Sequence, residues 1–320
     1  MTTPVALPAA FSRSPFTVRD ALRVGISRKR LRARDLHSPL RGVRVQARLG
    51  AVHPVTAYAT RMPQHQFFSH VTAARFHGLP VPSRMLGSPM VHVAVLTPAR
   101  PPRAAGIVGH RMEVATVVDI RGYRVASAVE TWCSMAPDLS VDELIYMGDA
   151  LVRRKNPIAT MAELATAVRT RKGCRGILKL IEALEQVRPG TDSVKETELR
   201  LLLTRAGLPE PRVNLRINNE FGAFVAFGDL VFDEWKVIAE YDGRQHAESS
   251  AQYTKDIVRL DDLAALDYRV VRIDKTLLSL KLPAVTRVRN ALLRTGWRGV
   301  AARATRRGSC PSRRWPRGGG

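Results

Sequence analysis

Four side chains that can bind a metal ion or move a proton fall close together in the last third of the chain. Asp229, Glu240, Asp242 and His246 lie within the run GDLVFDEWKVIAEYDGRQH, residues 228–246. Carboxylate oxygens are ligands that Mg²⁺ or Mn²⁺ accepts, and the near-neutral pKa of imidazole permits proton transfer. Two acids on neighbouring strands could therefore hold one divalent cation. In a basic protein, such a cation suggests hydrolysis of nucleic acid.

The strands that carry these acids follow from the apolar pattern. Residues 224–232 and 236–241 are predicted to form two strands joined by a tight connection. If this hairpin is centred between residues 234 and 235, paired residues have numbers that add up to 469. Asp229 then lies opposite Glu240, with Cβ atoms roughly 4.5–5.5 Å apart.

Strand alternation places Asp229 and Glu240 on the face that carries Val231 and Ile238, which we expect to be buried. Two carboxylates buried there without a cation or a proton would be costly. One alternative is that one or both acids lie at the end of the sheet in contact with water. A register slip of one residue would also undo the pairing.

Further elements surround this hairpin. Thr191 or Ser193 is expected to cap a helix that includes Glu196. Asp256 and Arg259 are three residues apart, so they either pair on a helix surface or face the acids. The predicted elements are a helix at 196–205, a strand at 213–217, a helix at 250–265, a strand at 268–273 and a helix at 283–294.

About 90 residues of this region resemble the PD-(D/E)xK nucleases, most closely the Vsr-like branch related to very-short-patch-repair endonucleases. The matching segments are SVKETELR (193–200), GDLVF (228–232), IAEYDGRQH (238–246), DIVRLDDL (256–263) and YRVVRI (268–273). The resemblance implies an α/β fold with an αβββαβ-type core, a mixed sheet flanked by helices. It also implies Mg²⁺-dependent phosphodiester hydrolysis.

The resemblance also assigns roles to residues of this chain. Asp229, Glu240 and the Tyr241 carbonyl would hold Mg²⁺ or Mn²⁺, and Glu196 would reach the cation directly or through a water. Asp242 stands where the family usually has a lysine, and it could add a metal ligand. His246 could act as general base, general acid or phosphate ligand, and His246 or Gln245 could orient the water. Arg244 and Arg259 would contact phosphates.

The charge balance favours a nucleic-acid partner. The chain has 51 Lys+Arg against 28 Asp+Glu, a formal net charge of +23, and such an excess attracts phosphate polyanions. Its three cysteines form no CxxC-type pair, which argues against a disulfide framework or a thiolate zinc site. We find no signal peptide and no apolar run long enough to span a bilayer, so we expect a cytoplasmic protein.

Residues 1–50 are predicted to form a winged helix-turn-helix. After a short helix and a turn, Ser27 could cap a second, basic helix, and residues 43–46 form a strand. A small helical hairpin with a solvated basic face is the alternative. The segment FTVRDALRVGISRKRLRARDLHSPLRGV resembles, more weakly, the winged helix of AbiEi-type antitoxins, which bind DNA. The cations expected to contact DNA are Arg28, Lys29, Arg30, Arg32 and Arg34.

Residues 51–190 are predicted to form a mixed α/β domain, followed by the nuclease-like domain at 191–298 and a disordered basic tail at 299–320. A helix is expected at 67–78, a strand at 91–96, a loop at 98–106, and helices at 127–135, 141–152, from 161 and from 176. Seven of the eight histidines lie in 37–110 without metal-like spacing, so we expect them to be structural.

Three functions compete at this point. The first is a metal-dependent DNA endonuclease with an N-terminal DNA-binding module. The second is a DNA-binding regulator or antitoxin-like protein whose nuclease-like core is inactive. The third is an RNA-processing enzyme, because the chemistry at phosphorus does not distinguish the sugar.

Overall fold

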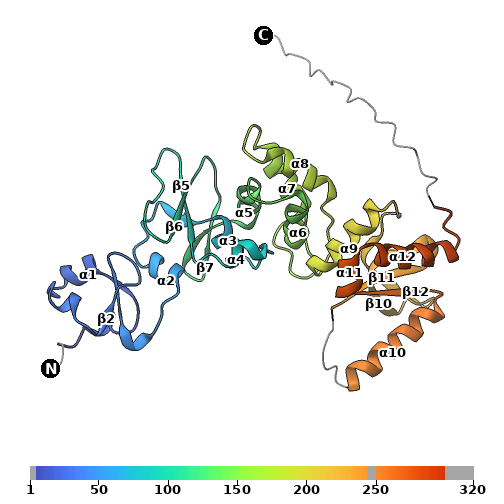
Figure 1. The fold of residues 1–320 in the computed structure, drawn as a ribbon, viewed down its shortest axis with the longest axis horizontal. Helices are drawn as coiled ribbons and strands as arrows, with labels where there is room; N and C mark the ends of the chain where they lie inside the picture. Colours follow the sequence, from blue (N-terminus) through green and yellow to red (C-terminus); the bar gives the residue numbers. More distant parts are fainter. Residues whose placement is uncertain (1–4, 244–249, 300–320) are drawn as a thin grey trace, which may run out of the picture. The chain divides into compact units, whose positions relative to one another are not determined.

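The computed structural model describes residues 5–243 and 250–299. The chain divides into two compact units, Met1–Thr197 and Glu198–Gly320 (Figure 1). Its described part is a mixed α/β protein in which helices flank several sheets. This agrees with the fold class expected at its coarsest level. No helix within the described ranges is long and apolar enough to cross a membrane.

The N-terminal part contains a small sheet with strand order β1-β3-β2. Helix α1 (Val18–Arg23) begins at Thr17, whose Oγ1 accepts a hydrogen bond from the Asp20 N–H at 3.0 Å. Phe16, Ala21 and Leu31 form the buried core of this region. The strands are β1 (Phe16–Thr17), β2 (Leu36–His37) and β3 (Val43–Gln46), and short 3-10 turns cover Ala9–Phe11, Arg30–Arg32 and Ala47–Leu49.

The basic helix predicted after Ser27 is wrong, because only the 3-10 turn Arg30–Arg32 forms there. Ser27 does act as a cap, since its Oγ accepts the Arg30 N–H at 3.2 Å. The Arg30 guanidinium then reaches forward to the Asp35 carboxylate through two bonds of 2.8 and 2.7 Å. Ala33 is extended, with φ −66° and ψ 150°. The chain therefore turns into β2 instead of continuing a helix.

A second sheet of the first unit has the order β6-β5-β4-β8-β7. The helix predicted over 67–78 begins later than expected. Phe67 and Phe68 belong to a strand because they pair with Ala94 and Val93 and are fully buried in the sheet. The strands are β4 (Gln66–Phe68), β5 (Val91–Leu96), β6 (Ile107–Met112), β7 (Val117–Ile120) and β8 (Tyr123–Ala126), and the helices are α2 (Pro54–Ala59), α3 (His70–Phe76) and α4 (Ser83–Leu86).

Four helices complete the first unit close to the positions predicted. Ser127, Ser140 and Thr160 are N-caps, and each accepts a hydrogen bond from a backbone N–H three residues later. These caps fix the helix starts locally, which explains why the sequence located them. The helices are α5 (Ala128–Met135), α6 (Val141–Leu151), α7 (Met161–Arg169) and α8 (Ile177–Gln186).

The second unit is built on a four-stranded sheet with the order β12-β11-β10-β9. Neighbouring strands are antiparallel except for β11 and β12, which are parallel. The elements are α9 (Val194–Arg205), which begins in the first unit, β9 (Arg212–Asn218), β10 (Phe224–Phe232), a 3-10 turn (Asp233–Trp235), β11 (Val237–Asp242), α10 (Ser250–Ala265), β12 (Arg269–Asp274), α11 (Lys275–Leu280) and α12 (Leu282–Arg294). Only α11 lacks a counterpart in the sequence prediction.

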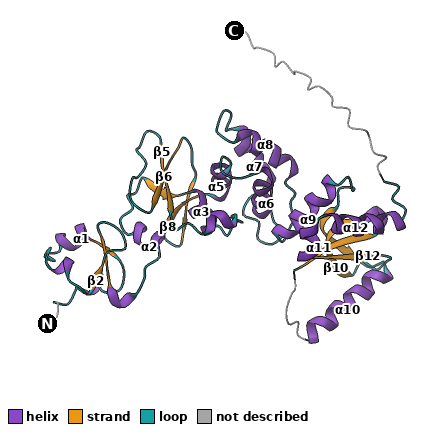
Figure 2. Cartoon of the chain, in the orientation of Figure 1, coloured by secondary structure: helices purple, strands orange, loops and turns teal. Residues whose placement is uncertain are grey.

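Helices cover both faces of this sheet (Figure 2). On one face, Leu230 and Phe232 pack in a cluster with residues of α12 such as Val288. On the other face, Val231 and Ile238 pack with Leu263 of α10.

Candidate functional site

The pairing of β10 with β11 has the predicted register. Leu230 pairs with Ala239, Val231 with Ile238 and Phe232 with Val237, and the numbers of each pair add up to 469. Asp229 and Glu240 adjoin the Leu230–Ala239 end of this ladder. The Tyr241 N–H donates a hydrogen bond to the Asp229 Oδ2 at 3.1 Å, so the Asp229 carboxylate lies beside β11.

Glu240 lies on the face covered by α10, two residues after Ile238 on β11. Strict alternation does not hold at Asp229, because a Cβ on the preceding Gly228 would already point at Val231 and Ile238. Glu240 is 7% exposed and Asp229 is half-buried, whereas Val231 and Ile238 are fully buried. A buried carboxylate requires a compensating charge or hydrogen bonds, so the partners of Glu240 decide what this site can do.

Arg259 of α10 supplies that charge to Glu240. Its Nη1 and Nη2 donate to the two Glu240 carboxylate oxygens at 2.6 and 2.9 Å. This bidentate bond is the largest cause that raises the pKa of Arg259, and nearby Asp256 and Asp229 contribute to the same shift. The sequence assigned Arg259 to phosphate contacts, whereas the structure places its guanidinium among the acids.

The network extends to the edge strand β12. Arg272 Nη2 donates to Asp256 Oδ2 at 3.1 Å, and Arg272 Nη1 lies 3.8 Å from Asp242 Oδ2. Asp256 is buried and lies 3.8 Å from Arg259 Nε, so of the two arrangements expected for this pair the structure has the one that faces the acids. The described network thus joins four carboxylates to two guanidinium groups: Asp229, Glu240, Asp242 and Asp256, with Arg259 and Arg272.

This donor set fits a hard divalent cation in chemical type. All its candidate ligands are oxygens, and the carboxylates exceed the guanidinium groups by two charges. The Tyr241 side chain packs against the cluster on the opposite face, so Tyr241 would contribute only its carbonyl oxygen, as expected. Within residues 5–243 and 250–299, no three His, Cys, Asp or Glu side chains are grouped so that they could hold a metal ion.

The remaining predicted site residues are placed differently. Glu196 belongs to the first unit and takes part in the N-terminal cap of α9. Its carboxylate accepts hydrogen bonds from the Asp192 N–H and the Ser193 hydroxyl, both at 2.9 Å. Ser193 is the helix cap, because its Oγ accepts the Glu196 N–H at 3.2 Å. Arg244, Gln245 and His246 lie outside the described residues.

The basic residues of the N-terminal region fall into two groups. Arg30 is mostly buried and held by Asp35 and by the Val5 carbonyl, so it supports the local fold. The other four side chains are exposed, and none lies within ion-pair distance of an acid among the described residues. They are Arg28, Lys29, Arg32 and Arg34.

Sequence reasoning missed a cluster of three histidines in the first unit. The rings of His70 and His110 stack with centroids 3.5 Å apart, and His92 Nδ1 lies 2.9 Å from His110 Nε2. Their spacing along the chain is irregular. His92 and His110 lie on the neighbouring parallel strands β5 and β6, where His110 pairs with Ala94. Their proximity could have been predicted only if the pairing of these two strands had been known.

Comparison with known proteins leaves the family open. No protein-family model matches the chain. Two uncharacterised proteins of Mycobacterium tuberculosis, one from each of two strains, are each 24% identical over 168 residues. The match covers 52% of this chain and 61% of each relative, so the chain spans less than two thirds of their length. No solved structure matches.

Proposed function

We propose that the second unit is a divalent-metal-dependent nuclease of the PD-(D/E)xK type that hydrolyses phosphodiester bonds in DNA. The observation that carries this proposal is that Asp229 and Glu240 both lie near Arg259, with the Asp229 carboxylate bonded to the main chain of Tyr241, the residue after Glu240. The order of elements from α9 to β12, one helix, three strands, one helix and one strand, supports it.

The residues of the site would divide the work as follows. Asp229, Glu240 and the Tyr241 carbonyl would hold Mg²⁺ or Mn²⁺. When bound, the cation supplies an activated water and neutralises charge on the phosphate oxygens. Arg259 would then give up one or both of its hydrogen bonds to Glu240. It would become available to a phosphate, the role that the sequence predicted. His246 remains the proposed proton donor or acceptor.

The two isosteric variants Asp229→Asn and Glu240→Gln test the proposal in a plasmid-nicking assay. The native chain should nick DNA with Mg²⁺ or Mn²⁺ and not with EDTA, and each variant should lose both cleavage and metal binding measured by calorimetry. Asp262→Asn is the matched control, because Asp262 is an exposed acid on α10, the helix that packs against the site. Cleavage by Asp229→Asn at the native rate would overturn the proposal.

A second candidate is a DNA-binding regulator with an inactive core. The bidentate Arg259–Glu240 pair favours it, because this pair neutralises Glu240 without any cation. The exposed cations Arg28, Lys29, Arg32 and Arg34 would supply the contacts to DNA phosphates. Such a protein would slow the migration of DNA in a gel equally with Mg²⁺ and with EDTA, and would cut it in neither.

A further inference from the structure

A cavity in the first unit is lined by none of the acids of the second unit and is rich in positive charge. It has a volume of about 610 Å³, within the range of small-molecule sites. Arg111 of β6 and Arg171, Lys172 and Arg175 from the loop between α7 and α8 line it, and Glu113 is its only lining acid. An adjacent cavity is lined instead by two acids, Glu130 and Glu163, and by Arg171.

Three of these cations are available to a ligand. Arg111, Lys172 and Arg175 are exposed, and none lies within ion-pair distance of an acid among the described residues. Arg171 differs, because it donates to the Glu130 carboxylate and to the Ala167 carbonyl. Arg171 therefore anchors the loop, while its neighbours present charge to the cavity.

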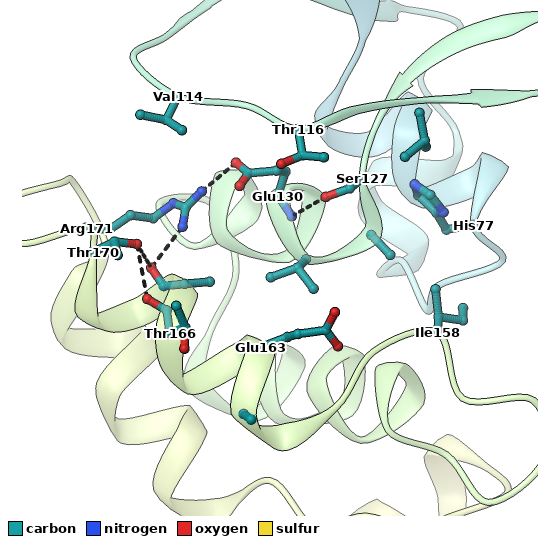
Figure 3. A pocket seen from close by; sticks show the side chains of 15 residues that line it. His77, Val114, Thr116, Ser127, Glu130, Ile158, Glu163, Thr166, Thr170 and Arg171 are labelled. Atoms are coloured by element: carbon teal, nitrogen blue, oxygen red, sulfur yellow. Dashed lines mark hydrogen bonds and ion pairs between the residues drawn. The ribbon is translucent and has the colours of Figure 1, made fainter.

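The loop is fixed at both ends. Figure 3 shows Arg171 reaching from the end of α7 to Glu130 on α5. At the other end, a Cβ on Gly176 would lie 2.8 Å from the Ala136 carbonyl carbon, so the loop approaches the end of α5 closely. Lys179 Nζ donates to the Leu139 carbonyl at 2.8 Å. The loop that carries Lys172 and Arg175 is thus held at both of its ends.

Two histidines of the cluster complete the wall. His70 Nδ1 bonds Ser69 Oγ at 3.0 Å, and His110 Nε2 bonds His92 Nδ1 at 2.9 Å. The second ring nitrogens, Nε2 of His70 and Nδ1 of His110, have no partner among the described residues. Burial lowers the pKa of His70 and lowers that of His110 to about 4. Both rings are therefore neutral at pH 7, both line the cavity, and each has one ring nitrogen left for a further hydrogen bond.

We propose that this cavity binds a small phosphorylated molecule of nucleotide size through its phosphate group. Lys172, Arg175 and Arg111 match the negative charge of the phosphate, and the two histidine nitrogens add neutral hydrogen bonds. The site uses no residue of the acidic network, so the nuclease proposal can fail while this one stands.

Calorimetry on the full chain with ADP, inorganic pyrophosphate and adenosine tests the proposal. ADP and pyrophosphate should bind and adenosine should not. The variant K172Q/R175Q should weaken binding by roughly 10-fold or more, because two charge-assisted bonds are lost. H70A should also weaken ADP binding, because the proposed bond from the His70 ring to the phosphate is lost.

The matched control is R124Q/K155Q, which removes the same charge from exposed positions of the first unit that do not line the cavity. It should change the affinity less than twofold if binding is local. Equal losses in the two double variants would show general attraction to a basic protein and would overturn the proposal. Absence of binding by both ADP and pyrophosphate, or adenosine binding as well as ADP, would also overturn it.

Discussion

Arg259 links the stability of the second unit to the proposed binding of a metal ion. It neutralises a carboxylate, Glu240, that is only 7% exposed. Removing one partner of a buried pair leaves the other charge uncompensated, which usually costs more than the pair contributes. The same removal would free both Glu240 oxygens for a cation. Stability and metal affinity should therefore change in opposite directions at this residue.

The substitution Arg259→Met tests this opposition. We expect a loss of about 1–3 kcal/mol in the free energy of unfolding without metal, because Glu240 loses its partner. Affinity for Mn²⁺ should rise. Urea unfolding with EDTA and calorimetry with Mn²⁺ measure the two effects, and Arg269→Gln, at an exposed residue of β12, is the control. Unchanged stability would show that Glu240 does not depend on Arg259.

The histidine cluster makes a prediction about pH. Burial lowers the pKa of His70 and His92, and that of His110 to about 4, from an ordinary value of 6.5. The unfolded chain therefore binds more protons than the folded chain below pH 6.5. The free energy of unfolding therefore has its full value, as far as these histidines are concerned, above pH 6.5. It decreases as the pH falls towards 4 and below.

Unfolding free energies at pH 7.5 and pH 5 should differ by more in the native chain than in H110Q. Each histidine contributes a slope of up to about 1.4 kcal/mol per pH unit over this window. H65Q, at an exposed histidine outside the cluster, is the control for removal of an imidazole. A native pH dependence in H110Q would mean that His110 does not titrate differently in the folded and unfolded chains.

At the scale of elements, the loop between α7 and α8 depends on two glycines of different kinds. Gly173 has φ +81° and open space within 4 Å of the point where a Cβ would lie, whereas Gly176 has φ +84° and lies against the main chain of Ala136. Both require the left-handed region that favours glycine. Only Gly176 also requires the absence of a side chain.

Alanine at each position separates the two requirements. Gly173→Ala should cost about 1–2 kcal/mol for the backbone conformation alone. Gly176→Ala should cost a further 1–3 kcal/mol or so for the contact with α5, measured by urea unfolding of the two variants side by side. Equal losses would mean that the loop moves away from α5 without cost.

Local signals explain which elements the sequence could predict. Hydroxyl caps at Ser127, Ser140 and Thr160 mark helix starts, and the short connection between β10 and β11 fixes the hairpin register. Contacts with residues outside the segment itself explain the failures. Phe67 and Phe68 are strand residues because β5 lies beside them, and the basic helix is replaced by a turn that Asp35 stabilises from outside it.

The candidate site divides in the same way. The register of Leu230–Phe232 with Val237–Ala239 followed from one hairpin, so a short segment was sufficient to predict it. Strict alternation did not hold at Asp229, because Gly228 already faces Val231 and Ile238. The network through Arg259, Asp256 and Arg272 depends on how α10 lies over the sheet, which no short segment encodes. The histidine cluster depends on strands that are far apart in the sequence.

At the scale of the whole molecule, the net charge of +23 predicts how nucleic acid would bind. If the N-terminal segment contacts DNA phosphates, R28Q/K29Q/R32Q/R34Q should reduce the dependence of binding on salt. The slope of log K against log salt should fall by up to roughly 3.6 when all four cations contact phosphates. Fluorescence anisotropy with duplex DNA at several salt concentrations measures the slope.

The control for that measurement is R103Q/R121Q/R124Q/K155Q, which removes the same charge from exposed positions elsewhere in the first unit. Its slope should stay near the native value. If both quadruple variants lower the slope equally, DNA is attracted by the overall charge and the N-terminal segment has no special part in binding.

The ion pair between Arg259 and Glu240 has a practical consequence for handling the protein. Because the guanidinium compensates Glu240 in the absence of a cation, stripping the sample with a chelator should neither unfold nor precipitate it. If the proposed metal dependence holds, the chelated protein should regain activity on dialysis into magnesium without a refolding step. Arg259 would thus keep Glu240 compensated between cycles of metal loss and return.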